Sequence, residues 1–91
     1  MQRKFDLLRW TPGRIAHVAH HGVTPEEPDE VLGDPGGVLV CGRSGFYRLY
    51  GKTGAGRKLL LVLADEGAGI GGPVTARDLT DAERRRYCGD D

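Results

Sequence analysis

The chain has 91 residues, and its 13 Lys and Arg side chains balance 13 Asp and Glu side chains, so the formal net charge is zero at pH 7. A chain of this length buries only about 60–65% of its unfolded surface and cannot supply two stable cores, so we expect one domain over residues 1–91. The neutral balance excludes any argument for nucleic-acid binding from net charge alone.

Two helices are predicted in the first third of the chain. Thr11 and Pro12 supply a capping hydroxyl and a first-turn proline for a helix that we expect to run to about His21, with Gly22 as the residue that ends it. Residues 24–27 (Thr-Pro-Glu-Glu) form a capping box for a second, acidic helix to about residue 32.

Four strands, separated by glycine-rich turns, are then predicted over residues 38–42, 46–52, 57–64 and 70–77. The short turns favour antiparallel pairing. Residues 59–64 are apolar at both parities, which predicts a strand in mid-sheet covered on both faces. Pro73 places the last strand at an edge or a bulge.

A capping box at Thr80 and Glu83 opens a short C-terminal helix from Asp81 to about Tyr87. The predicted fold class is therefore α+β.

The sequence lacks the long apolar segments that secretion or membrane insertion requires. Charged side chains interrupt residues 1–10, and the longest apolar run is residues 59–64. We therefore expect a cytoplasmic protein with no membrane partner. Cys41 and Cys88 stand outside any C-x-x-C pair, so a disulfide framework or a zinc knuckle is not expected.

Charge is strongly segregated along this neutral chain. Residues 24–36 contain acids and no base, whereas residues 43–58 contain Arg and Lys and no acid. In the strand 46–52, alternation places two aromatic rings and two cations on one face, at positions 46, 48, 50 and 52. Such a mixture suits RNA, because rings stack on bases and cations pair with phosphates. An ordinary amphipathic sheet with Tyr47 and Leu49 towards the core explains the same alternation.

The first helix carries all three histidines, His17, His20 and His21, opposite an apolar stripe. Imidazole suits proton transfer near neutral pH. Solvated histidines on a surface helix are an equally good explanation for His17. The H-x-x-x-H spacing of His17 and His21 can also bind a metal, but no third ligand with suitable spacing is evident. We therefore expect no metal and no other cofactor.

Several fragments recur in the same order in a known family. In the first half, these are residues 9–12 (Arg-Trp-Thr-Pro), 20–24 (His-His-Gly-Val-Thr) and 34–35 (Asp-Pro). In the second half, they are residues 51–53 (Gly-Lys-Thr), 56–60 (Gly-Arg-Lys-Leu-Leu), 75–80 (Thr-Ala-Arg-Asp-Leu-Thr) and 83–87 (Glu-Arg-Arg-Arg-Tyr). Over residues 7–87 the chain resembles the BrnT family, with its W-D-P, K-H-G-V and D-P segments, glycine-led hairpin and S-A-R, T, E-R-x-x-Y ending.

The resemblance implies a RelE-like microbial ribonuclease architecture with two N-terminal helices, a four-stranded mainly antiparallel sheet and a short C-terminal helix. BrnT proteins are toxins of bacterial type II toxin–antitoxin systems, so it also implies a metal-independent endoribonuclease that cleaves RNA and arrests growth. A cognate DNA-binding antitoxin, forming a toxin–antitoxin hetero-oligomer, is the implied partner. The alternative is a catalytically weak or inactive homologue that acts as a non-enzymatic module binding that antitoxin.

RNA cleavage without a metal needs a base, an acid and cations near the phosphate. By resemblance, His21 matches the family's histidine, Arg57 and Arg77 match family arginines, and His20 stands where the family has lysine. The expected catalytic set is His21, Arg57, Arg77, His20, Arg84 and Tyr87, and the expected RNA-binding residues are Arg48, Lys52 and Lys58. As alternatives, Arg57 is a surface ion-pair partner and Glu83 only a capping residue. A further family arginine is missing, because residues 71–74 read Gly-Gly-Pro-Val.

Overall fold

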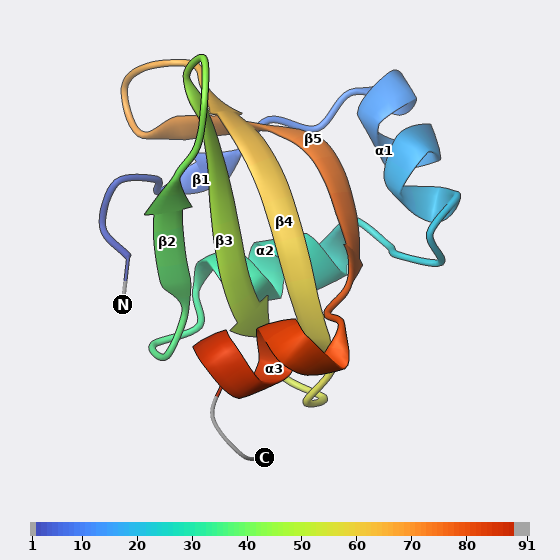
Figure 1. The fold of residues 1–91 in the computed structure, drawn as a ribbon. Helices are drawn as coiled ribbons and strands as arrows, with labels where there is room; N and C mark the ends of the chain where they lie inside the picture. Colours follow the sequence, from blue (N-terminus) through green and yellow to red (C-terminus); the bar gives the residue numbers. More distant parts are fainter. Residues whose placement is uncertain (1, 89–91) are drawn as a thin grey trace.

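The computed structural model describes residues 2–88. Its elements are β1 (Leu7–Leu8), α1 (Pro12–Ala19), α2 (Glu26–Leu32), β2 (Val38–Cys41), β3 (Phe46–Lys52), β4 (Lys58–Asp65), β5 (Ile70–Asp78) and α3 (Asp81–Tyr87) (Figure 1). The predicted α+β class is confirmed, and every predicted helix and strand lies within two residues of its expected bounds. None of the helices in this part of the chain is long and apolar enough to span a membrane.

Helix α1 starts as expected and ends two residues earlier than expected. The hydroxyl of Thr11 accepts a hydrogen bond from the Arg14 amide at 3.2 Å. At the other end, the amide of His21 bonds the carbonyl of Val18, so the last turn tightens to i→i−3 bonds. Gly22 then adopts a φ of 71°, as expected of a residue that ends a helix. His20 and His21 consequently lie in the turn that follows α1.

The sheet has five strands in the order β1-β5-β4-β3-β2, where four had been expected. Strands β2 to β5 are antiparallel neighbours as predicted, but β1 adds a parallel pair to β5 through Leu7↔Ile70 and Leu8↔Gly71. The prediction missed β1 because two residues cannot show a period-two pattern. A bulge does occur at Pro73: the register of β4 and β5 shifts between Val62 and Leu63.

Two layers cover the sheet unequally. Helix α2 lies behind the sheet in Figure 1, and α3 crosses only the lower end of its front. The rear core includes Leu49, Leu61 and Val31, all fully buried. On the front, which we call the α3 face, Leu60 is buried under α3, whereas Val62 is only partly buried. The expectation that β4 is covered on both faces is therefore right for its first half and wrong for its second, because α3 is too short to reach further.

Candidate RNA-binding and catalytic site

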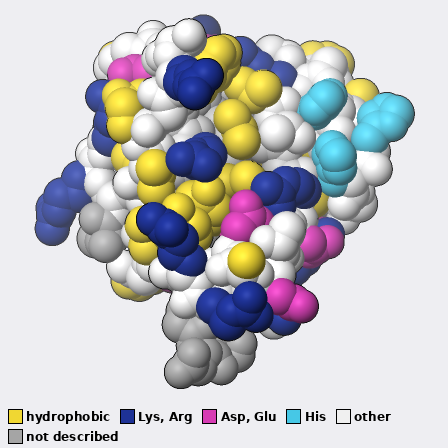
Figure 2. Space-filling model, in the orientation of Figure 1, with side chains coloured by type: hydrophobic (Ala, Val, Ile, Leu, Met, Phe, Trp, Pro, Cys, Tyr) yellow, Lys and Arg dark blue, Asp and Glu magenta, His cyan; other side chains and the backbone are white. Residues whose placement is uncertain are grey.

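The strand register arranges side chains of the α3 face in rows across the sheet. One row holds Arg48, Val62 and Thr75, and the next row, nearer α3, holds Tyr50, Leu60 and Arg77. Figure 2 shows hydrophobic side chains on this face interspersed with Lys and Arg side chains, and the three histidines together at one side. The α3 face therefore combines an apolar floor with positive charge.

Arg77 is fixed by the helix that crosses its row. Its Nη1 and Nη2 atoms donate to Oε1 and Oε2 of Glu83 at 2.8 and 2.9 Å, and Nη1 also donates to the Asp78 carbonyl. This bidentate pairing lowers the pKa of Glu83 to about 2, with help from the Thr80 amide. Of the five N–H donors of a guanidinium, three are used here. With 39% of its side chain exposed, Arg77 keeps donors for a further anion.

Arg57 joins three segments. Its Nε and Nη2 donate to the carboxylate of Asp78 at 2.8 and 3.1 Å, while Nη1 reaches Glu27 Oε2 at 3.0 Å and the Gly22 carbonyl at 2.9 Å. The pKa of Arg57 rises as a result, and Arg57 in turn lowers the pKa of Asp78. The pKa of Glu27 is lowered first by the Thr24 amide and then by Arg57. Most of the donors of Arg57 are therefore occupied, and Arg57 fastens the loop directly after His21.

The histidines cluster at the C-terminal end of α1, which packs along β5. His17, His20 and His21 are all exposed, and the rings of His17 and His21 lie edge to face with centroids 6.0 Å apart. Within residues 2–88, no group of three or more His, Cys, Asp or Glu side chains is arranged to hold a metal ion. Among the predicted site residues, Arg57 donates a hydrogen bond to the carbonyl of Gly22, the residue that follows His21.

Three of the predicted residues, Arg57, Lys58 and Arg84, line one hollow of about 350 Å³ beside Asp78. Arg84 is itself paired with Asp81 at 2.6 Å. Both positively and negatively charged side chains therefore line this hollow.

The side chain of Tyr87 packs against the sheet. Its ring stacks on that of Tyr50 with centroids 3.7 Å apart and planes inclined by 9°. Burial raises the pKa of the Tyr50 hydroxyl, and Tyr87 adds to that rise. The stack fastens α3 to the sheet and so supports the pair of Arg77 and Glu83.

The predicted RNA-binding residues lie at two heights on the sheet. Lys52 and Lys58 are cross-strand partners at the lower end. Arg48 lies higher, with its guanidinium carbon 6.0 Å from the centre of the Tyr50 ring.

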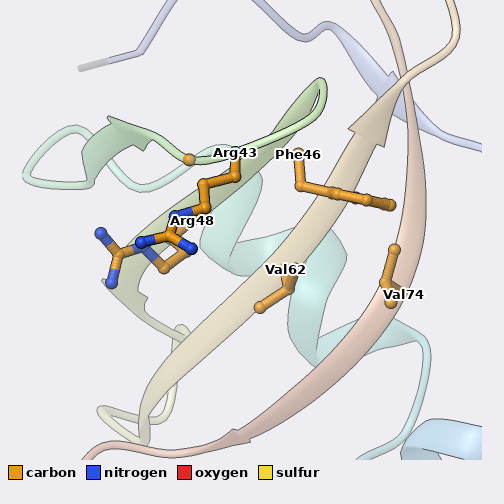
Figure 3. Close-up of a pocket in the computed structure, with 6 residues that line it drawn as sticks. Arg43, Phe46, Arg48, Val62 and Val74 are labelled. Carbon is orange, nitrogen blue, oxygen red and sulfur yellow. The ribbon is translucent and has the colours of Figure 1, made fainter.

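A larger hollow, of about 470 Å³, opens on the uncovered part of the α3 face and is lined by Gly42, Arg43, Phe46, Arg48, Val62 and Val74 (Figure 3). Sequence reasoning paired Phe46 with Arg48 by alternation but missed Arg43 and Val74. The turn before β3 and the bulge in β5 bring those two residues in; the turn and the bulge were expected, but the directions in which they send the side chains of Arg43 and Val74 were not. The signal that could have identified Arg43 was its place at the start of the acid-free stretch 43–58.

By sequence, the chain matches no family model and no curated protein. Its fold is similar to that in the crystal structure of the Brucella abortus ribonuclease toxin BrnT, with a TM-score of 0.66 over 82% of this chain and 97% of that chain, at 10% sequence identity. An identity this low relates the two proteins by fold. The expected likeness to BrnT is thus confirmed for the fold, with β1 as the correction to the strand count.

Proposed function

We propose that this chain is the toxin of a bacterial type II toxin–antitoxin pair and acts as an endoribonuclease that cleaves RNA without a metal cofactor. The observation that carries the proposal is the fold shared with B. abortus BrnT over nearly the whole of that ribonuclease toxin. The mixture of cations and apolar groups on the α3 face supports it, since single-stranded RNA requires both.

The chemistry is assigned as follows. His21 transfers a proton, either from the attacking 2′-hydroxyl or to the departing 5′-oxygen. Arg77, held rigid by Glu83, presents its remaining donors to the negative charge that builds on the non-bridging phosphate oxygens in the transition state. Arg77 lies on β5, against which α1 packs, and His21 lies in the turn that follows α1. His20, next to His21, supplies a second imidazole or a cation.

The other predicted residues act around this pair. Arg57 acts mainly by positioning, because it binds the Gly22 carbonyl and so fixes the chain after His21. Tyr87 holds α3 against Tyr50. Lys58 and Arg84 line the hollow beside Arg57, and together with Arg48 and Lys52 they attract the RNA backbone.

A specific observation favours a second candidate function. Arg57, Arg77 and Arg84 each pair with a carboxylate of this chain, which offsets the positive charge that a phosphate would meet. In addition, residues 71–74 (Gly-Gly-Pro-Val) contain no arginine, although the family resemblance led us to expect one there. Under this alternative the protein binds a DNA-binding antitoxin, with acidic helix α2 contributing to the contact, and cleaves nothing.

One assay separates the two functions. Purified protein is incubated with total RNA at low salt in EDTA, and the wild type is compared with His21→Ala and Arg77→Ala. We expect EDTA-resistant cleavage by the wild type, strong loss in both variants, and relief of growth arrest when they are expressed. His17→Ala is the matched control, since His17 is an exposed histidine beside His21 and is not assigned a role. Intact RNA combined with tight binding of a ribbon-helix-helix protein would establish the second function instead.

A further inference from the structure

The hollow on the open half of the α3 face has two chemically different sides. In Figure 3 the ring of Phe46 reaches across β4 towards Val74, with Val62 lower on β4, while Arg43 and Arg48 extend together to the other side. Carbon surface thus lines one side and guanidinium groups line the other. A ligand that fits must be apolar and flat at one end and anionic at the other.

The arginines of this hollow differ from those of the candidate catalytic site. Arg57, Arg77 and Arg84 are each bound by a carboxylate. Arg43 and Arg48, by contrast, form no ion pair with any acid among the described residues 2–88, and the strand and turn that carry them contain no acid. Two like charges on one side of a hollow repel each other, and a bound anion removes that repulsion. Their positive charge is therefore available to a ligand.

The apolar side is unusually exposed for a hydrophobic surface. Phe46 and Val74 each keep 42% of their surface in contact with solvent, whereas Leu49, Leu61 and Leu63 of the same sheet are fully buried. Helix α3 stops short of them, so no element of the described chain covers this area. A planar ring placed on Phe46 would remove its face from water, and nucleobases stack on aromatic side chains whatever their sequence.

We propose that this hollow binds one nucleotide of single-stranded RNA, with its base stacked on Phe46 beside Val62 and Val74 and its phosphate held by Arg43 and Arg48. The identification of the ligand as RNA rests on the proposed function. A folded protein partner fits less well, because stable protein interfaces bury on the order of 1,200 Å² or more, whereas this hollow has a volume of about 470 Å³ and six lining residues.

The position of the hollow relative to Arg77 supports its use by the same RNA strand. Arg48, Val62 and Thr75 form the row that borders the hollow, and Arg77 lies in the next row of the same face. Two residues along a strand span about 7 Å. A nucleotide in the hollow therefore places an adjacent part of the RNA backbone near Arg77, which gives the subsite a positioning role for cleavage.

The test measures binding rather than cleavage. The probe is a fluorescein-labelled, 2′-O-methylated RNA of about ten nucleotides, a length within the usual range for one binding groove. Because methylation blocks the attacking hydroxyl, the oligonucleotide stays intact. An abasic oligomer of equal length reports backbone binding alone. Affinity is read from fluorescence anisotropy for the wild type and for Phe46→Leu, Arg43→Met and Arg48→Met.

We expect Phe46→Leu to weaken binding of the base-bearing oligomer about tenfold and to leave abasic binding unchanged, because only the stacking contact is lost. We expect Arg48→Met and Arg43→Met each to weaken both oligomers and to reduce the slope of log affinity against log salt by about 0.7. The matched controls are Leu7→Ala, an exposed apolar side chain on the far edge, and Arg85→Met, an exposed arginine outside the hollow. Both controls should bind like the wild type.

The outcomes separate this proposal from the proposed function. If total RNA is cleaved but the three hollow variants bind like the wild type, the ribonuclease stands and the subsite is wrong. If no RNA is cleaved but the variants show the expected losses, the ribonuclease is wrong and the subsite stands. If Phe46→Leu leaves RNA binding intact and weakens the binding of an antitoxin protein, the hollow is a protein-docking surface and the proposal is overturned. Should Phe46→Leu misfold by circular dichroism, the salt slopes of the arginine variants decide alone.

Discussion

The pair of Arg77 and Glu83 makes a quantitative prediction about stability and pH. Replacing Glu83 with Gln removes the negative charge but keeps an oxygen for Arg77 and for the Thr80 amide, since Gln also completes a capping box. Folding lowers the pKa of Glu83 from 4.5 to about 2, and each unit of such a shift corresponds to about 1.4 kcal/mol. The side chain is 20% exposed, so solvent screening reduces the expected loss to roughly 2–3 kcal/mol.

The direction of the pH dependence follows from the lowered pKa. A carboxylate that is more acidic in the folded state stabilises the protein above its unfolded pKa, and this stabilisation is lost as the pH falls from about 4.5 to about 2. Urea unfolding of the wild type and of Glu83→Gln, repeated between pH 7 and pH 2, measures this stabilisation. The two free energies of unfolding should differ at pH 7 and converge near pH 2.

The control for this prediction is Asp81→Asn, which breaks an ion pair of the same helix. Asp81 pairs with Arg84 at 2.6 Å, but its side chain is 78% exposed, so we expect a loss of only a few tenths of a kcal/mol. The reasoning is refuted if Glu83→Gln and the wild type lose stability in parallel below pH 5, because the bond to Arg77 would then not be what lowers the pKa of Glu83.

Three further predictions concern the supports of the site. Arg57→Met should lower the free energy of unfolding by about 2–3 kcal/mol, because Glu27 and the Gly22 carbonyl lose a charged donor, and amide hydrogen exchange at residues 21–23 should accelerate; unchanged exchange would rule out its positioning role. Tyr87→Ala should cost about 1–2 kcal/mol and change the near-ultraviolet circular dichroism of Tyr50, whose ring it covers. Gly71→Ala should destabilise by about 1–3 kcal/mol in thermal melts, since a Cβ there would collide with Leu63 and crowd Phe5, whereas Gly13→Ala, with no atom within 4 Å of its Cβ, should not.

Local rules predicted most of the fold. Capping residues and helix-ending glycines located the helices. Thr80 and Glu83 form the expected reciprocal capping box, and Gly22 adopts a left-handed conformation just after α1 ends. Alternation correctly assigned Leu49 to the rear core and Arg48 to the α3 face. Strand β1 was missed because it is held by backbone bonds, such as that from the Asp6 amide to the Gly69 carbonyl, which leave no trace in side-chain type.

The candidate site was less predictable, because its electrostatics depend on partners distant in sequence. Arg57 meets Glu27 across 30 residues and Asp78 across 21, and neither distance corresponds to a helical or strand repeat. The sequence therefore identified the cations but not the acids that hold them. The alternatives that made Arg57 an ion-pair partner and Glu83 a cap describe real contacts, and Glu83 does more than cap, because it also binds Arg77.

The pairing of cations with carboxylates divides four arginines of the described chain into two groups. Arg57 and Arg77 are held by carboxylates and so have fixed geometry at the cost of charge, whereas Arg43 and Arg48 keep their charge and form no such bond within residues 2–88. Stabilising a transition state requires donors that are already in position, whereas attracting RNA requires net positive charge that falls off with salt. Substitution of Arg77 should therefore reduce cleavage more than affinity, and substitution of Arg48 should reduce affinity in a salt-dependent way. Equal effects of both substitutions on affinity would show that this division has no functional meaning.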